Sequence, residues 1–284
     1  MHARVDLARD RYGLLATGVE ARVAAIFVHG FSGHPEKTWL QFQTLMDSAG
    51  KKSGILSWWA TCDAYFYSYD SSRQIGPNTA DLLDFIGAVF PSPNWGKTGA
   101  NGIGELVRRY DSLVLVGHSE GAVMVRSAIL RHIQANGQQR NAASRHGTIL
   151  DAHLRLFAPA IWGALISGWK GVLLRSLVLG DLVESCLHYS PAYQQLAHES
   201  QFLREIRERT VSLAKAHPDI RALRARNVFG AGDTCVCMEA LETDPPAVYE
   251  PNRTHASICK PSNEYLMPLS FVRHDDEATV AVAS

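Results

Sequence analysis

Residues 113–121 read Leu-Val-Leu-Val-Gly-His-Ser-Glu-Gly and combine a buried-strand pattern with a Gly-x-Ser-x-Gly motif. A helix-compatible segment, residues 122–135, follows at once. This order of strand, turn and helix is that of a nucleophile elbow. Glycines at positions 117 and 121 let the strand and the helix pass close together. We therefore expect the hydroxyl of Ser119 to project from a strained turn above a helix N-terminus.

The motif also has an accidental interpretation, because glycine and serine are common residues. At average usage the pattern arises by chance in roughly one chain of this length in ten. The flanking strand and helix patterns favour the catalytic interpretation, since they supply the context that the motif needs. A second motif upstream, His29-Gly30 at the end of the strand-like run Val23–Val28, favours it further.

Short strand-like runs alternate with helical patterns along the chain, which predicts an α/β fold with a mostly parallel central sheet and helices on both faces. We expect one domain over residues 1–284, with a cap insertion at about residues 159–189, where apolar residues are broken by glycines. The expected strands are residues 23–28, 64–67, 113–116, 154–157 and 227–229, with a weaker one through Val248 and Tyr249. The expected helices are residues 78–89 and 122–135, and one long helix that starts with Ser190-Pro191 and ends at His217-Pro218.

Composition excludes several classes of function. Lys plus Arg and Asp plus Glu both number 28 and form no basic stripe, so we expect no nucleic-acid partner. Five cysteines without a small-scaffold pattern favour a reducing compartment. The first thirty residues lack a signal-peptide core, and no apolar run is long enough for an integral membrane span. We expect a cytoplasmic protein; the sequence leaves its oligomeric state open.

A serine nucleophile needs an oxyanion site and an acid besides its base. The loop after His29-Gly30 predicts that the backbone N–H of Phe31 is one oxyanion donor, and the N–H of Glu120 is the second. Asp233 is the expected acid, because it follows the strand-like run 227–229 and a glycine-rich turn. Glu239 and Glu242 are the alternatives.

The expected base is His255. The chain order of serine, acid and histidine in this kind of site leaves only His255 and His274 after Asp233. His274 lies in a charged tail that is typical of a solvated segment. His118 is expected to point away from the nucleophile. His29 and His34 are interpreted as loop-shaping residues near the mouth of the site.

Three stretches together resemble the α/β-hydrolase superfamily, and within it the lipase-like serine hydrolases of the PGAP and SERAC type. They are residues 28–39 (Val-His-Gly-Phe-Ser-Gly-His-Pro-Glu-Lys-Thr-Trp), the elbow at 117–121, and residues 255–261 (His-Ala-Ser-Ile-Cys-Lys-Pro). The resemblance runs from residue 23 to 261. It implies an α/β-hydrolase fold, Ser119 as nucleophile, His255 as base, and oxyanion donors at residues 31 and 120.

The sequence departs from this family at two positions. Ala122 replaces a common second glycine, and Glu120 occupies a position that is usually apolar. The carboxylate of Glu120 is expected either to lower activity toward anionic substrates or to face solvent.

The expected activity is hydrolysis of a carboxylic ester or thioester through an acyl-enzyme, acting on a small-molecule or lipid-like substrate with an apolar acyl group. No metal or organic cofactor is expected, and Cys235-x-Cys237 is interpreted as lacking a matching second ligand pair. Trp162, Leu165 and Trp169 of the cap are the candidate substrate-binding residues, with ordinary cap core as the alternative. The rival functions are an acyl transferase or thioesterase, an inactive binding or signalling module, and a lipid-surface binding protein, which the lack of a basic amphipathic helix disfavours.

Overall fold

An eight-stranded sheet runs through the centre of the computed structural model, which describes residues 2–8, 12–17, 21–39, 41–48, 58–93, 108–136, 147–165 and 190–273. The strand order is β1-β2-β4-β3-β5-β6-β7-β8. Six neighbouring strands, β4 to β8 in that order, are parallel, and β1 and β2 add an antiparallel hairpin at one edge. The strands are β1 His2–Ala8, β2 Tyr12–Thr17, β3 Val23–Val28, β4 Cys62–Tyr67, β5 Ser112–His118, β6 His153–Phe157, β7 Ala225–Gly230 and β8 Val248–Glu250.

The central strands are buried along their whole length, as expected for parallel strands that are covered on both faces. Phe27 of β3 lies at the middle of an aromatic cluster and contacts Trp39, Phe42 and Phe66. All six predicted strands are confirmed. The hairpin of β1 and β2 was not predicted.

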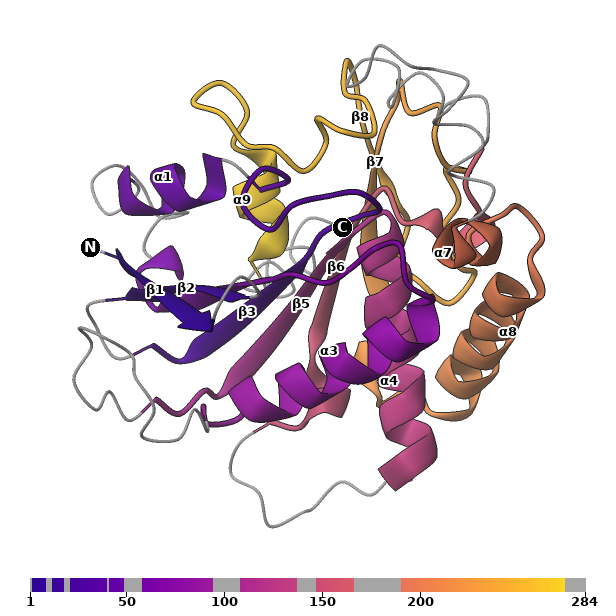
Figure 1. The fold of residues 1–284 in the computed structure, drawn as a ribbon, viewed down its shortest axis with the longest axis horizontal. Coiled ribbons are helices and arrows are strands. Elements are labelled where there is room, and N and C mark those ends of the chain that lie inside the picture. Colours follow the sequence, from indigo (N-terminus) through magenta and orange to yellow (C-terminus); the bar gives the residue numbers. More distant parts are fainter. Residues whose placement is uncertain are drawn as a thin grey trace, which may run out of the picture.

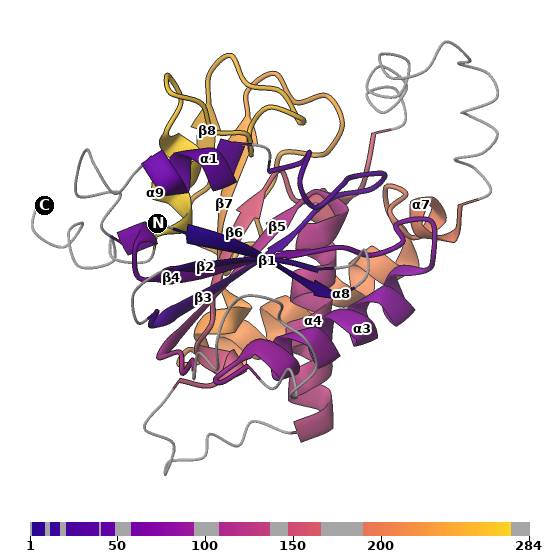
Figure 2. The same cartoon turned by 60° about the vertical axis from the view of Figure 1, so that its left-hand side comes forward.

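Helices cover both faces of the sheet (Figures 1 and 2). The long helices α3, α4 and α8 lie on one face, and α1 and α9 lie on the other. The α-helices are α1 Gln41–Ser48, α3 Ile75–Val89, α4 Glu120–Asn136, α7 Pro191–Gln195, α8 Gln201–Ala216 and α9 Met267–Val272. Short 3₁₀ helices are η2 Ile149–Asp151, η3 Ala160–Trp162 and η4 Arg221–Leu223. None of the described helices is both long enough and apolar enough to cross a membrane.

The single long helix predicted from Ser190 to His217 is wrong. The structure has two helices, α7 and α8, with an irregular segment over residues 196–200 between them. Ser200 causes the break, because its Oγ accepts a hydrogen bond from the Leu203 N–H at 3.2 Å and donates one to the Gln195 carbonyl at 2.6 Å. Ser200 therefore caps a new helix, as serine side chains often do when they bind nearby backbone groups.

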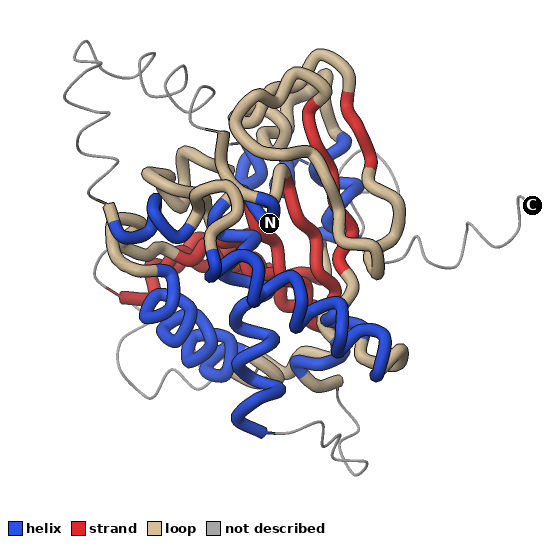
Figure 3. The backbone as a smooth tube through the Cα atoms, turned by 90° about the vertical axis from the view of Figure 1, so that its right-hand side faces the viewer, coloured by secondary structure: helices blue, strands red, loops and turns tan. Residues whose placement is uncertain are grey.

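The carboxyl ends of the parallel strands meet at one edge of the sheet. In the register, Val28 at the end of β3 pairs with Gly117, and His118 at the end of β5 pairs with Phe157. Loops gather at one end of the strands, as Figure 3 shows. In open α/β sheets ligands bind at this edge. The predicted cap lies mostly outside the described residues, so the cap and the single-domain organisation remain predictions.

Candidate active site

Ser119 occupies the sharp turn between β5 and α4. Its φ is 55°, in the left-handed region that a non-glycine residue rarely adopts. Backbone hydrogen bonds hold this conformation: the Ser119 N–H donates to the Phe157 carbonyl at 3.0 Å, and the Ser119 carbonyl accepts from Ala122 and Ala160 at 3.2 and 3.3 Å. The strained turn that the motif predicted is therefore present.

The elbow has no room for side chains at its two glycines. A Cβ added to Gly121 would lie 2.3 Å from the carbonyl oxygens of Val28 and His29. A Cβ added to Gly117 would lie 2.5 Å from the Cα of Ala122. Helix α4 thus passes directly against the end of β3, which brings the loop after β3 beside Ser119.

Asp233 and His255 form a buried hydrogen-bonded pair. His255 Nδ1 lies 2.8 Å from Asp233 Oδ2, and each residue is 6% exposed. The other carboxylate oxygen, Oδ1, accepts a hydrogen bond from the Cys235 N–H at 2.8 Å. Because an ionised carboxylate only accepts, the proton lies on Nδ1, and Nε2 of a neutral His255 keeps a lone pair. This is the tautomer that a general base needs.

The alternative acids lie elsewhere. Glu242 pairs with Lys215, Oε1 to Nζ at 2.5 Å, and both side chains are more than half exposed. Glu239 is also exposed. Of the three candidate acids, Asp233 is the one that forms a hydrogen bond with His255 in the described part of the chain.

Ser119 and His255 line the same pocket, which has a volume of about 420 Å³. Within the described residues the Oγ of Ser119 has no hydrogen-bond partner. Catalytic hydrogen bonds are often long or poorly aligned before substrate binds. The pocket is lined by Gly30, Phe31, Ser32, Gly33, His34, Lys37, Thr38, His118, Ser119, Cys235, His255, Ala256, Cys259 and Lys260.

The loop after β3 contacts the elbow closely. A Cβ added to Gly30 would lie 2.9 Å from the Cβ of Ser119. Tyr69 holds the start of this loop, since its ring stacks on His29 at 4.4 Å and its hydroxyl donates to the His29 carbonyl at 2.8 Å. Burial lowers the pKa of His29 to about 4, so the ring is neutral. Oxyanion donation by the N–H groups of Phe31 and Glu120 remains a prediction.

His118 contacts the main chain of the proposed base, His255. Its Nε2 lies 2.9 Å from the main-chain carbonyl of His255, and the two rings are 4.8 Å apart. A carbonyl only accepts, so Nε2 carries the proton. Burial is the main cause that lowers the pKa of His118 to about 3, so the ring is neutral. Nothing in the sequence indicated this contact.

Glu120 is fully buried, so the expectation that it faces solvent is wrong. Burial raises its pKa well above the usual range, with the Tyr69 hydroxyl opposing and Asp70 reinforcing the shift. A raised pKa favours the neutral carboxylic acid. The described lining of the pocket does not include Glu120. The expected effect of Glu120 on activity toward anionic substrates remains a prediction.

The predicted cap residues are placed in part. Trp162 lies on η3, with the Arg207 guanidinium carbon 4.3 Å from its ring centroid. The Leu165 N–H donates to the Cys235 carbonyl at 2.8 Å. Neither Trp162 nor Leu165 belongs to the described pocket lining, and Trp169 lies outside the described residues. Their role in substrate binding remains a prediction.

One group in the described part of the chain has the composition of a metal site. Ligand-type atoms of Asp233, Cys235 and His255 lie within 4.8 Å of one another. Cys237 is outside this group, and its Sγ lies 3.7 Å from the Nδ1 of His198. The two cysteines of Cys235-x-Cys237 therefore have different surroundings.

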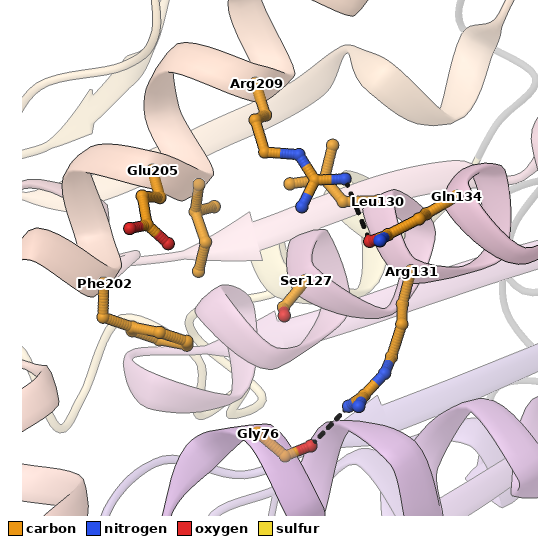
Figure 4. Close-up of a pocket in the computed structure, with 9 residues that line it drawn as sticks. Gly76, Ser127, Leu130, Arg131, Gln134, Phe202, Glu205 and Arg209 are labelled. Atoms are coloured by element: carbon orange, nitrogen blue, oxygen red, sulfur yellow. Dashed lines mark hydrogen bonds between the residues drawn. The ribbon is translucent and has the colours of Figure 1, made fainter.

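A second pocket, of about 210 Å³, lies between α3, α4 and α8 (Figure 4). Its arginines already have partners: Arg131 donates to the Gly76 carbonyl at 2.8 Å, and Arg209 to Gln134 Oε1 at 3.3 Å. It shares no lining residue with the pocket of Ser119. Its described lining is Gly76, Ser127, Leu130, Arg131, Gln134, Phe202, Glu205, Ile206 and Arg209.

Solved structures similar to this chain are known, whereas no protein-family model and no curated protein sequence matches it. The peroxisomal α/β-hydrolase Lpx1 from Saccharomyces cerevisiae is 11% identical, with a TM-score of 0.54 over 100% of this chain and 89% of that one. Est1E from Butyrivibrio proteoclasticus is 12% identical, with a TM-score of 0.50 over 100% and 99% of the two chains. The propeptide form of lipase BlEst2 from Bacillus licheniformis is 14% identical, with a TM-score of 0.51 over 96% of this chain.

The chain therefore has the α/β-hydrolase fold that the resemblance implied. It spans 54% of the propeptide form of the Bacillus lipase, so that protein's activity does not transfer with the fold. The finer likeness to the PGAP and SERAC type remains a prediction.

Proposed function

We propose that this protein is a serine hydrolase that cleaves carboxylic ester or thioester bonds through an acyl-enzyme. The observation that carries the proposal is the 2.8 Å hydrogen bond between Asp233 and His255 at a pocket that also contains the elbow serine. A nucleophile, a base and an orienting acid are the parts that acyl transfer by serine needs.

In the proposed reaction the Oγ of Ser119 attacks the substrate carbonyl carbon, and the Nε2 of His255 takes the hydroxyl proton. Asp233 stabilises the imidazolium that forms. The backbone N–H groups of Phe31 and Glu120 stabilise the developing oxyanion, a contribution of about 3 kcal/mol for each donor. His255 then returns the proton to the leaving alcohol or thiol, and a water molecule hydrolyses the acyl-enzyme by the same steps.

The pocket supports a substrate with both an apolar and an acidic part. Phe31 and Ala256 give it apolar surface, while Lys37 and Lys260 contribute positive charge. The described lining contains no carboxylate residue. Opposite charges attract more strongly in a pocket than in open water. We therefore infer an apolar acyl group, as predicted from the sequence, with an anionic group tolerated beside the ester.

Hydrolysis of p-nitrophenyl esters of graded acyl length tests the proposal. The series includes one neutral ester and one of equal length that ends in a carboxylate. Ser119→Ala, with its fold checked by circular dichroism, is the control. Turnover by the natural protein and its loss in Ser119→Ala support the proposal. Equal rates in both proteins contradict the proposal. If neither protein hydrolyses any ester, the result favours the rival binding or signalling module.

A further inference from the structure

Cys235 introduces a thiol beside the pair that the proposed reaction uses. Its Sγ, a carboxylate oxygen of Asp233 and a ring nitrogen of His255 all lie within 4.8 Å of one another, and all three residues are buried. The main chain fixes this proximity, because the Cys235 N–H donates to Asp233 Oδ1 at 2.8 Å. The proposed ester hydrolysis has no use for a thiol here.

These three groups are ligands that zinc prefers. Zinc binds thiolate sulfur at about 2.3 Å, and imidazole nitrogen and carboxylate oxygen at about 2.0–2.2 Å. In a tetrahedral site such bonds put neighbouring ligand atoms about 3.3–3.8 Å apart. The ligand-type atoms of Asp233, Cys235 and His255 lie within 4.8 Å of one another, so side-chain rotation has to bring them to this spacing. A bound ion would replace the 2.8 Å hydrogen bond between Asp233 and His255.

An ion can reach these three side chains through the pocket, and one coordination position stays open to the pocket after it binds. Cys235 and His255 both line the pocket that contains Ser119. Three protein ligands with the fourth position open to a cavity are the arrangement of zinc sites that keep a water or small ligand. An entry path of this kind is one requirement for a reversible metal site.

We propose that Asp233, Cys235 and His255 form a binding site for a thiophilic divalent cation, with zinc as the reference ion, and that occupancy blocks the active site. The cation accepts electron pairs from the thiolate sulfur, one carboxylate oxygen and one imidazole nitrogen. The thiol proton leaves to solvent, and the imidazole keeps its single proton on the other nitrogen. No oxidation occurs. The binding stands independently of the proposed function, whereas the blocking effect rests on it.

Zinc titration of the chain of residues 1–284 against a chromophoric chelator tests the binding. We expect one zinc per chain in the natural protein and at least about tenfold weaker binding in Cys235→Ser. Cys237→Ser is the matched control, because this thiol lies two residues away and outside the group. Thermal unfolding of the zinc-free variants checks that both are folded.

Cobalt(II) provides a second readout of the ligands. A thiolate-to-cobalt charge-transfer absorption is expected in the natural protein and in Cys237→Ser, and it is expected to vanish in Cys235→Ser. Asp233→Asn is expected to keep this absorption but to weaken zinc binding, since it loses one oxygen ligand. Equal zinc affinity in the natural protein and Cys235→Ser, or no binding by either, overturns the proposal.

Ester hydrolysis tests the blocking effect separately. Zinc at saturation is expected to stop turnover, a chelator to restore it, and Cys235→Ser to need at least about ten times more zinc. Full turnover at saturating zinc rejects the blocking effect but does not contradict the existence of the metal site. Absence of ester hydrolysis without zinc rejects the proposed function, and the blocking effect with it, whereas the titration still decides whether the site exists.

Discussion

His118 donates a hydrogen bond from its Nε2 to the main-chain carbonyl of His255 at 2.9 Å. The two residues are 137 positions apart in the chain, yet one precedes the nucleophile and the other is the proposed base. The elbow thus holds the backbone of the loop that carries the base. Removing this bond takes away one buried hydrogen bond, a loss of about 0.5–1.5 kcal/mol.

His118→Phe is therefore expected to lower kcat about tenfold or more while KM changes little, because the substrate contacts remain and the base moves. His118→Gln keeps an N–H donor and is expected to retain more of kcat. Steady-state kinetics on one p-nitrophenyl ester measure both. Equal losses of kcat in the two variants would show that His118 acts through packing alone.

Asp233→Asn is expected to lower kcat by about 10⁴, because an amide facing His255 Nδ1 favours the wrong tautomer of the ring. Glu242→Gln is expected to change kcat by less than about twofold, since its exposed pair with Lys215 contributes little. Kinetics on the folded variants compare the two. If Glu242→Gln lost more activity than Asp233→Asn, the acid would be misassigned.

Glu120 makes the stability of the protein depend on pH. Its pKa in the folded state is raised well above the value of 4.5 expected in the unfolded chain, so the folded state holds the proton more tightly. The unfolded state loses that proton above about pH 4.5, and stability falls as the pH rises from there toward the raised pKa. Glu120→Gln removes this titration.

The Tm of Glu120→Gln minus that of the natural protein is therefore expected to grow between pH 5 and pH 8. Thermal unfolding at several pH values measures this difference. A difference that stays constant with pH would mean that Glu120 is ionised in the folded state or is unimportant for folding.

Gly121→Ala is expected to destabilise the fold by about 1–3 kcal/mol and to abolish activity, because its Cβ would lie 2.3 Å from two carbonyl oxygens of the β3 end. Gly87→Ala is the matched control. Gly87 lies inside α3 with nothing within 4 Å of an added Cβ, so alanine there is expected to stabilise by about 0.5–1 kcal/mol. Denaturant unfolding measures both. Similar effects at the two positions would contradict the steric account.

The sequence predicted the central strands and the elbow because their signals are local. An apolar run such as residues 113–116 is typical of a strand buried on both faces, and the glycines around Ser119 mark a turn. The break before α8 was missed, because an N-cap by Ser200 competes with a strong helical pattern on both sides.

Long-range contacts in the site were beyond prediction from the sequence. The bond from His118 depends on how the loop after β8 folds back over β5. Glu120 is buried next to Tyr69, which follows a different strand and donates a hydrogen bond to the start of the loop after β3. A residue type alone does not tell whether a glutamate beside the nucleophile faces solvent or lies in the core.

Trapping the acyl-enzyme tests the central claim most directly. The protein is mixed with an activated ester, quenched in acid during turnover, and digested for peptide mapping by mass spectrometry. We predict that the added mass of one acyl group lies on Ser119, and that it is absent from Ser119→Ala and accumulates little in His255→Ala. Turnover of the ester with no adduct on Ser119, or with the adduct on another residue, would contradict the account.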